Sequence, residues 1–286
     1  PDTVRSDLLR AYGDGYYEGV DYSLLGTTLR GRNILRVSPV EKSWGPDYIR
    51  YGINLDTNFT VDSTYTLRAA YHKTWLNRVG GQFLTYGEIG SRSGIGVDYY
   101  QPVDELQHYF VETNFRSGNK FTGLYQNDNK LADYRITETD LRLSGGINLG
   151  LLGQLRAGWE KTWYKAQVDT GSPLFPDESK TYHGWFAALE MEQTDRLYFP
   201  TSGWSTAARY FDSQSESYSK IFADVRGYTS IGNWVLGTKL TYQGSPTGQL
   251  PYYDLGNLGG MLNMTAFAIG QLKGDDMSYG SVRAER

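Results

Sequence analysis

From residue 47 onward, about twelve segments, most of them 9–15 residues long, alternate apolar and polar side chains. Alternation with a period of two is the pattern of a β-strand whose two faces meet different environments. One such segment places Tyr65, Leu67 and Tyr71 on one face and Arg68 on the other. A strand that crosses a bilayer at a tilt needs about 9–11 residues. Segments of this length and pattern predict strands with lipid outside and water inside.

The connections between these segments predict how they are arranged. The predicted strands are 47–57, 62–76, 81–90, 94–102, 106–116, 132–149, 154–168, 180–193, 203–213, 217–229, 233–243 and 276–286. Long connections at 117–131, 169–179 and 244–275 all follow odd-numbered strands, as do the long outer loops of bacterial barrels. The sequence therefore predicts a mostly β fold, an antiparallel transmembrane β-barrel whose first strand runs outward. A water-soluble antiparallel protein is disfavoured, because its strands average about 5–6 residues.

The beginning of the chain carries a different pattern. Apolar residues recur at helical spacing between Val4 and Tyr12, and alternating runs follow at 16–24 and 29–40. Helix, strand, strand is the order expected for part of a small α+β module. Because Trp44-Gly45-Pro46 interrupts the alternation, it marks a boundary. The predicted division is 1–44 for the module and 45–286 for the barrel.

Composition excludes several classes of function. A formal net charge of −4 argues against a nucleic-acid partner, and the absence of cysteine removes thiol catalysis and thiolate metal sites. Aromatic residues make up 15% of the chain, which suits anchors at membrane interfaces. No catalytic motif occurs, and His72, His108 and His183 lack the spacing of metal ligands. The sequence therefore predicts no catalytic residue, cofactor or metal.

The connection at 244–275 is the strongest candidate for a functional segment. Connections longer than about 15 residues without structure of their own are usually functional. This one is rich in glycine and apolar residues, so we expect it to fold back into the barrel rather than stand in water. Its candidate residues are Gly259, Gly260, Asn263, Met264, Thr265, Ala266, Phe267, Gly270 and Gln271.

Four segments, in order along the chain, carry a resemblance to a known family. They are LLRAYGDGYYEGVDY at 8–22, VEKSWGPDYIRYG at 40–52, DRLYFPTSGW at 195–204 and LGGMLNMTAFAIGQL at 258–272. Together they resemble the Omp-eighty-five, or bacterial surface antigen, superfamily of barrels preceded by periplasmic POTRA modules. The first two segments resemble the end of a POTRA module and its junction with the barrel. The third matches the inner turn D-x-x-x-F-P-x-x-G-W, and the fourth resembles the sixth outer loop, which folds into the lumen in this family. The inner-turn candidates are Asp195, Phe199, Pro200, Gly203 and Trp204.

The resemblance implies a location and a set of partners. It is nearest to the patatin-type autotransporters of type V secretion, which carry an upstream patatin-like lipase. The implied location is the bacterial outer membrane, with the N-terminal module in the periplasm. The implied partners are outer-membrane lipid, the barrel-assembly machinery, the protein's own or another translocated polypeptide, and a second copy of the chain in a homodimer. The family barrel has sixteen strands, so the twelve strands here indicate a fragment lacking about four at its C-terminal side.

One residue departs from the family pattern. Many members carry, in the sixth loop, an arginine two places before the aromatic residue that ends the motif. Thr265 occupies that place here, so anchoring of the loop by that arginine is not expected.

The sequence is compatible with four functions, which its features support to different degrees. The resemblance favours a barrel that secretes or displays its own upstream patatin-like phospholipase domain. A general outer-membrane assembly or secretion factor is the first alternative, and a passive porin is the second. A porin would explain the strands but neither the N-terminal module nor the apolar loop. The last alternative is that the barrel itself is an enzyme, but no nucleophile–base spacing supports it; an activity of the complete protein would belong to the upstream lipase.

Overall fold

The structure is a computed structural model, and it describes residues 17–26, 34–41, 47–57, 63–126, 129–172, 174–196, 199–251, 254–259, 264, 267 and 271–286. Its strands are β1 (Tyr17–Leu25), β2 (Ile34–Glu41), β3 (Tyr48–Thr57), β4 (Ser63–Lys73), β5 (Gln82–Gly90), β6 (Arg92–Pro102), β7 (Tyr109–Gln126), β8 (Asn129–Asn148), β9 (Gly153–Thr170), β10 (Glu178–Glu192), β11 (Gly203–Ser213), β12 (Ser219–Ile231), β13 (Trp234–Gly244), β14 (Gly256–Leu258), β15 (Leu272–Gly274) and β16 (Met277–Glu285). Among the described residues, no helix has the length and apolarity that a membrane span requires. The helical pattern between Val4 and Tyr12 lies outside the described residues.

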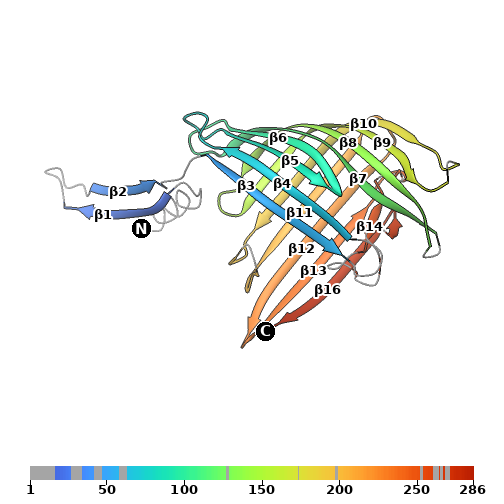
Figure 1. Cartoon of the computed structure of the whole chain (residues 1–286). Helices are drawn as coiled ribbons and strands as arrows, with labels where there is room; N and C mark the ends of the chain where they lie inside the picture. Colours follow the sequence, from blue (N-terminus) through green and yellow to red (C-terminus); the bar gives the residue numbers. More distant parts are fainter. Residues whose placement is uncertain are drawn as a thin grey trace.

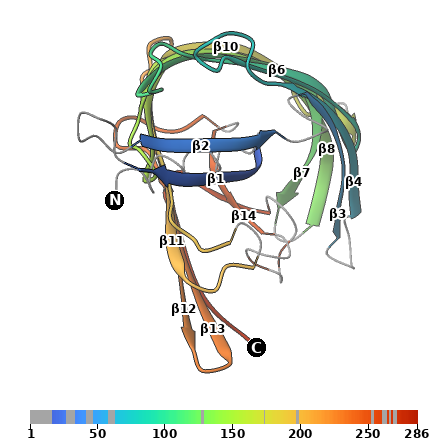
Figure 2. The same cartoon turned by 90° about the vertical axis from the view of Figure 1, so that its left-hand side faces the viewer.

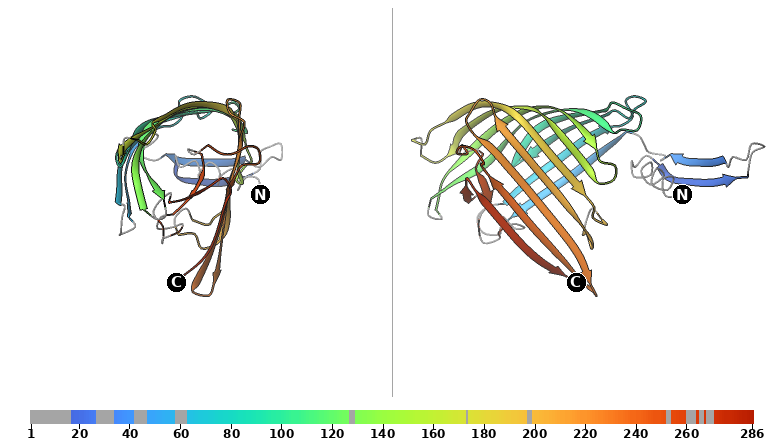
Figure 3. Two further views of the ribbon diagram at one scale, coloured as in Figure 1. Left: turned by 90° about the vertical axis from the view of Figure 1, so that its right-hand side faces the viewer. Right: turned by 180° about the vertical axis from the view of Figure 1, so that it is seen from behind.

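Twelve of these strands, β3 to β13 and β16, form one antiparallel sheet. Consecutive strands pair with each other, and β16 pairs with β13 across the connection that contains β14 and β15. Figures 2 and 3 show the sheet curving through an arc, with β14 on the inside of the arc. The predicted fold class, a mostly β chain with an antiparallel sheet of about twelve barrel strands, is confirmed.

The strands β1 and β2 form a separate antiparallel hairpin. Figure 1 shows this hairpin beyond the end of the large sheet at which β3 begins. The strand β1 covers most of the alternating run predicted at 16–24. The strand β2 begins at Ile34, later than the run predicted from residue 29, and residues 27–33 lie outside the described part.

The hairpin of β7 and β8 is longer than its sequence pattern indicates. The sequence predicts a connection at 117–131, but β7 continues to Gln126 and β8 begins at Asn129. The register pairs Ser117 with Thr139 and carries on past Lys120. Polar side chains occur on both faces of this stretch, so the sequence shows no apolar–polar alternation. The strands still form, because backbone N–H and C=O groups pair whatever the side chain is. The prediction of a long loop at this place is therefore wrong.

The two faces of the sheet differ as the alternation requires. One face of the sheet exposes large apolar side chains on the outside of the arc. On the edge strands β3 and β16, the exposed fraction of the residue is 72% for Ile53, 76% for Leu55 and 77% for Val282. Residues one place along the same strands point to the inside, where cross-strand ion pairs such as Arg68 with Glu88 form. An outer wall of this kind is compatible with lipid, and the inner wall is compatible with water.

The arc has two edges. In the order of the sheet, β3 pairs only with β4 and β16 pairs only with β13. Residues 47–57 are therefore not hydrogen-bonded to residues 276–286, and the described strands do not close on each other.

Engineered cysteine pairs will test the register and the open edge, because the chain has no cysteine of its own. Leu240 and Gly280 face each other across β13 and β16. Opposed residues of antiparallel strands have Cβ atoms about 4.5–5.5 Å apart, close to the distance that a disulfide needs. We expect the pair Leu240→Cys and Gly280→Cys to cross-link on mild oxidation, as measured by a mobility shift on non-reducing gels. The control pair, Ile53→Cys and Val282→Cys, is expected to stay reduced; its oxidation would contradict the open arc.

Candidate functional site

The inner face of the sheet carries a lattice of cross-strand ion pairs. The register places Arg142 opposite Glu160 on β8 and β9, and their side chains lie 2.9 Å apart. Arg209, on β11, binds the same carboxylate. Glu160 is buried, and a buried carboxylate is stable only when it is paired. Lys120 and Glu138 form a further pair at 2.8 Å between β7 and β8.

An apolar platform interrupts this charged face. Its residues come from the inner face of β8 to β11 and from the two segments that flank β12 and β13, and most of them are aromatic. The buried members are Ile136, Tyr164, Ala166, Tyr182, Phe186, Phe211, Tyr218 and Leu250. The alternation alone predicts a polar inner face, so this platform was missed by the sequence analysis. Leu250 and, partly buried, Leu255 reach the platform from the connection between β13 and β16.

Asp254 fixes the same connection to the wall. The hydroxyl of Tyr218 donates a hydrogen bond to Oδ2 of Asp254 at 2.6 Å, and Nζ of Lys220 lies 2.6 Å from Oδ1. The side-chain amide of Gln243 donates to the backbone carbonyl of Asp254 at 3.0 Å. Charge-assisted bonds of this kind are about twice as strong as neutral ones. A second tie runs within the connection, where the backbone N–H of Leu250 donates to a carboxylate oxygen of Asp275 at 3.0 Å.

The anchor and the predicted motif are different parts of the connection. Of the nine candidate residues, Gly259, Met264, Phe267 and Gln271 are described, and the others lie outside the described residues. Asp254, which makes the strongest contacts, was not among the candidates. A signal was available, because Asp254 is the only acidic residue between positions 245 and 274 of an otherwise apolar segment. The predicted structureless connection also contains a short hairpin, in which β14 pairs with β15.

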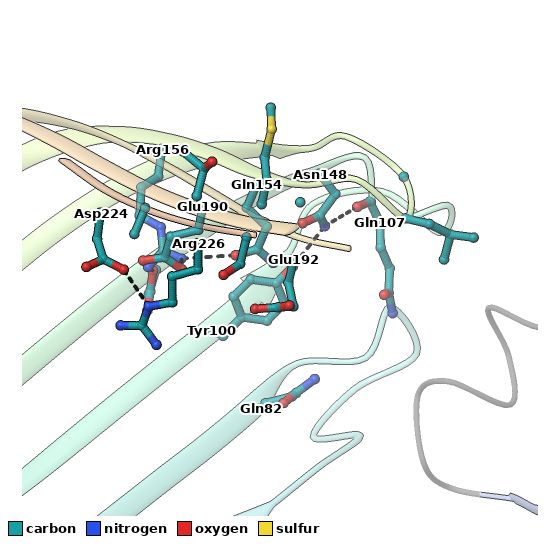
Figure 4. A pocket seen from close by; sticks show the side chains of 18 residues that line it. Gln82, Tyr100, Gln107, Asn148, Gln154, Arg156, Glu190, Glu192, Asp224 and Arg226 are labelled. Atoms are coloured by element: carbon teal, nitrogen blue, oxygen red, sulfur yellow. Dashed lines mark hydrogen bonds and ion pairs between the residues drawn. The ribbon is translucent and has the colours of Figure 1, made fainter. Parts of the chain in front are cut away.

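Two cavities lie along the inner face. One, of about 390 Å³, is lined by Asp254, Leu255 and Asn257 of the connection and by the charged lattice of β7 to β11. The other, of about 840 Å³, is shown in Figure 4. Its walls are polar, with Arg156 held between Glu112 at 3.2 Å and Glu190 at 2.9 Å. Walls of charged and amide groups offer hydrogen-bond partners to water and to a polypeptide backbone.

The inner-turn motif forms the connection between β10 and β11. The backbone N–H groups of Thr201 and Ser202 donate to Oδ1 of Asp195 at 2.8 and 3.0 Å, and the Thr201 hydroxyl donates to Oδ2 at 2.5 Å. These bonds lower the pKa of Asp195 to about 2, because they favour the charged carboxylate. Gly203 has a φ of +105°, and a Cβ there would lie 2.1 Å from the Gln193 carbonyl oxygen. The motif therefore specifies a tight turn.

The other inner-turn residues do not join these bonds. Phe199 has a positive φ of 52° and is 80% exposed, and Trp204 is exposed at the start of β11. The turn residues and the candidates in the connection between β13 and β16 belong to different connections. We therefore find two separate elements, a structural turn and an anchored inner segment.

The three histidines have ordinary partners. His72 Nδ1 lies 2.6 Å from the hydroxyl of Tyr48, and His108 Nδ1 lies 3.0 Å from a carboxylate oxygen of Asp104. His183 packs beside the ring of Trp159. Within the described ranges, no three acidic or histidine side chains are grouped closely enough to hold a metal ion.

Comparison with known proteins relates the fold to solved barrels. No protein-family profile and no curated protein matches the chain. The chain is similar to the crystal structure of BamA from Haemophilus ducreyi lacking POTRA domains 1–3, with a TM-score of 0.71 and 15% identity. It is also similar to CdiB from Acinetobacter baumannii, with a TM-score of 0.58 and 11% identity. The matches cover 98% and 94% of this chain but 60% and 52% of those chains. At these identities the likeness establishes the fold.

The Asp254 anchor can be tested with trypsin. Lys273 is the only Lys or Arg between residues 245 and 276, so cleavage after it reports release of the connection. We expect Asp254→Ala to destabilise docking by about 2 kcal/mol and to speed cleavage about thirtyfold, because it removes two charge-assisted hydrogen bonds. Tyr218→Phe removes one of them and should give an intermediate rate. Asp169→Ala is the control, since Asp169 pairs with Arg135 away from the connection. Equal rates in Asp254→Ala and the control would contradict the anchor.

The inner turn should depend on pH. The pKa of Asp195 is lowered, so its stabilisation of the turn is complete above the unfolded value of about 3.9 and is lost as the pH falls toward 2. Hydrogen-exchange protection of the Thr201 and Ser202 amides should fall over this range in the natural protein and be low at every pH in Asp195→Ala. Asp104→Ala is the matched control. It removes the bond from the Tyr109 N–H, 2.9 Å long, and should leave residues 201 and 202 protected; loss of their protection in that control would argue against a local effect.

Proposed function

We propose that this chain is the barrel of a bacterial outer-membrane protein that inserts or translocates another polypeptide. The observation that carries the proposal is the segment that Asp254 anchors against the inner wall. Such a segment narrows the lumen while leaving polar cavities beside it. The solved barrels of similar fold come from outer-membrane assembly and two-partner secretion, which supports this class of function.

A passive porin fits the inner face less well. A water-filled pore needs a polar wall throughout, whereas here an aromatic platform covers part of the wall. Leu250 occupies that platform and is itself buried. Part of the inner wall is apolar and binds a connection of the same chain. Such a barrel is better suited to a passage that opens and closes than to a permanently open pore.

The N-terminal region has a role in this proposal as a periplasmic receptor for the polypeptide. We assign residues 1–44 to a POTRA module and 45–286 to the barrel, on the strength of the sequence resemblance. The hairpin of β1 and β2 has only two strands, so each strand has a free edge within the described residues. An exposed edge can pair with an incoming extended chain.

The edges of the large sheet need partners within a membrane. Each unsatisfied backbone group in hydrocarbon costs several kcal/mol, so β3 and β16 cannot face lipid unpaired. We propose that further strands cover both edges and bring the wall to sixteen. Outer-membrane lipid and the barrel-assembly machinery are then the partners during insertion, and a homodimer is a further arrangement to examine.

The nature of the translocated polypeptide rests on the sequence resemblance alone. The patatin-type branch implies that the barrel secretes or displays its own upstream patatin-like phospholipase domain. A general assembly or secretion factor is the alternative, and it agrees with the same fold and inner segment. In both cases this chain has no catalytic role, and any lipase activity belongs to the upstream domain.

Deletion of residues 1–44 from the full-length protein tests the proposal. The expected result is loss of surface exposure or release of the upstream domain, measured by protease accessibility on whole cells. Heat-modifiable migration on gels serves as the control, because it reports whether the barrel still folds and inserts. Unchanged export by a folded deletion variant would reject the proposal. Planar-bilayer recordings provide a second arm: small, irregular openings are expected, and stable wide openings would favour a porin.

A further inference from the structure

The outward face of β9 differs from the rest of the outer wall. Glu160, Thr162 and Tyr164 are buried on the inner side of this strand, so the residues between them point away from the lumen. Two of those outward residues are Lys161 and Lys165. On the two neighbouring strands, the outward positions of β10 carry no lysine or arginine, and β8 carries Arg135, which is paired with Asp169 at 2.6 Å.

The two lysines are not neutralised by the protein. Lysines that point inward have carboxylate partners, such as Lys120 with Glu138 and Lys220 with Asp254. Lys161 and Lys165 form no ion pair with any described residue. The ammonium group of Lys161 instead lies 4.9 Å from the ring centroid of Trp163, the outward residue between them. An aromatic ring and a cation in this arrangement leave the charge available to an anion from outside.

The register surrounds these lysines with hydroxyl groups. Residues opposite Trp163 and Lys165 on β8 and β10 are all Ser or Thr, namely Thr139, Thr181, Thr137 and Ser179. Toward the other end of the strands, Lys161 stands opposite Leu141 on β8 and His183 on β10, and the next outward residue, Trp159, stands opposite the apolar Leu143 and Trp185. The change from apolar to hydroxyl-bearing residues marks a boundary on the wall, and the lysines stand at it.

The position of this boundary agrees with the depth of a membrane. The strand β9 begins at Gly153, so Trp163 stands ten positions along it. At about 3.3 Å per residue and a tilt of about 40°, this stretch covers about 25 Å, the height of the apolar band of an outer-membrane barrel. If β9 runs outward, as the proposed function requires, Trp163 lies at the outer edge of that band, with Lys161 just below the edge and Lys165 just beyond it.

We propose that Lys161, Lys165 and the hydroxyl groups between them bind a phosphorylated glycolipid of the outer leaflet. The two lysines are four positions apart on one strand, so their Cα atoms are about 13 Å from each other. Two phosphates on one sugar headgroup can reach both cations, whereas a phospholipid offers one phosphate. The Ser and Thr hydroxyls provide donors and acceptors for the sugar, and Trp163 provides an apolar surface at the headgroup level.

The experiment uses the full-length protein in neutral detergent and native mass spectrometry of lipid adducts. The probes are bisphosphorylated lipid A, its monophosphoryl form, and phosphatidylglycerol. In the double variant Lys161→Ala and Lys165→Ala, affinity for bisphosphorylated lipid A should fall about thirtyfold, since each lysine near an anionic surface contributes about a fivefold factor. The arginine double variant should keep its affinity. Lys73→Ala is the matched control, because Lys73 also faces outward but is paired with Asp47 at 3.6 Å.

Three results would overturn the proposal. They are an unchanged affinity in the alanine double variant, an equal loss for the monophosphoryl probe, and phosphatidylglycerol binding of equal strength with the same dependence on the lysines. Heat-modifiable migration confirms that each variant is folded. Export of the upstream domain is measured separately in the same variants, so a failure of the translocation proposal is distinguished from a failure of lipid binding.

Discussion

The pairing of backbone hydrogen-bonding groups is the constraint on which the whole wall depends. A bilayer offers no water to an unpaired N–H or C=O group, so a chain that crosses it with strands must form a continuous ladder. The twelve antiparallel strands meet this requirement everywhere except along β3 and β16. Beyond the headgroup level, β7 and β8 still continue as a ladder through a polar stretch, because each backbone N–H and C=O there also finds its partner on the neighbouring strand. Side chains decide which face meets lipid, but the backbone decides that there is a sheet.

The inner face shows how a polar wall holds a segment of its own chain. Buried charges there are stable because they are paired across the wall, as Glu160 on β9 is by Arg142 on β8 and Arg209 on β11. An aromatic platform within this lattice packs against Leu250, while the carboxylate of Asp254 binds Tyr218 and Lys220. The described part of the tie is thus an ion pair between an aspartate of the segment and a lysine of the wall.

Much of the fold was predictable because alternation records the two environments of each strand. Twelve strands were predicted and twelve are present in the sheet, and the inner turn at 195–204 has a hydrogen-bonding pattern that explains its motif. The features that the sequence did not predict depend on contacts between segments that are distant along the chain. Tyr182 and Phe186 are inward positions that alternation assigns to water, and only the covering segment makes them core residues. Asp254 was missed for the same reason, since its role depends on Lys220, which is distant in sequence.

The distribution of cations connects these observations. On the inner face, many cations are paired with carboxylates, such as Lys120 with Glu138 and Arg156 with Glu112, so that face presents hydrogen-bonding groups rather than a strong fixed field. On the outer face, a charge in contact with lipid is costly, and the wall has almost none along its apolar band. Outward cations such as Lys73 and Arg135 are paired with carboxylates, whereas Lys161 and Lys165 form no ion pair among the described residues, and they occur where the outward residues change from apolar to Ser and Thr. A cation at such a boundary extends its charged end toward the headgroups, and there the phosphates are the anions that attract it.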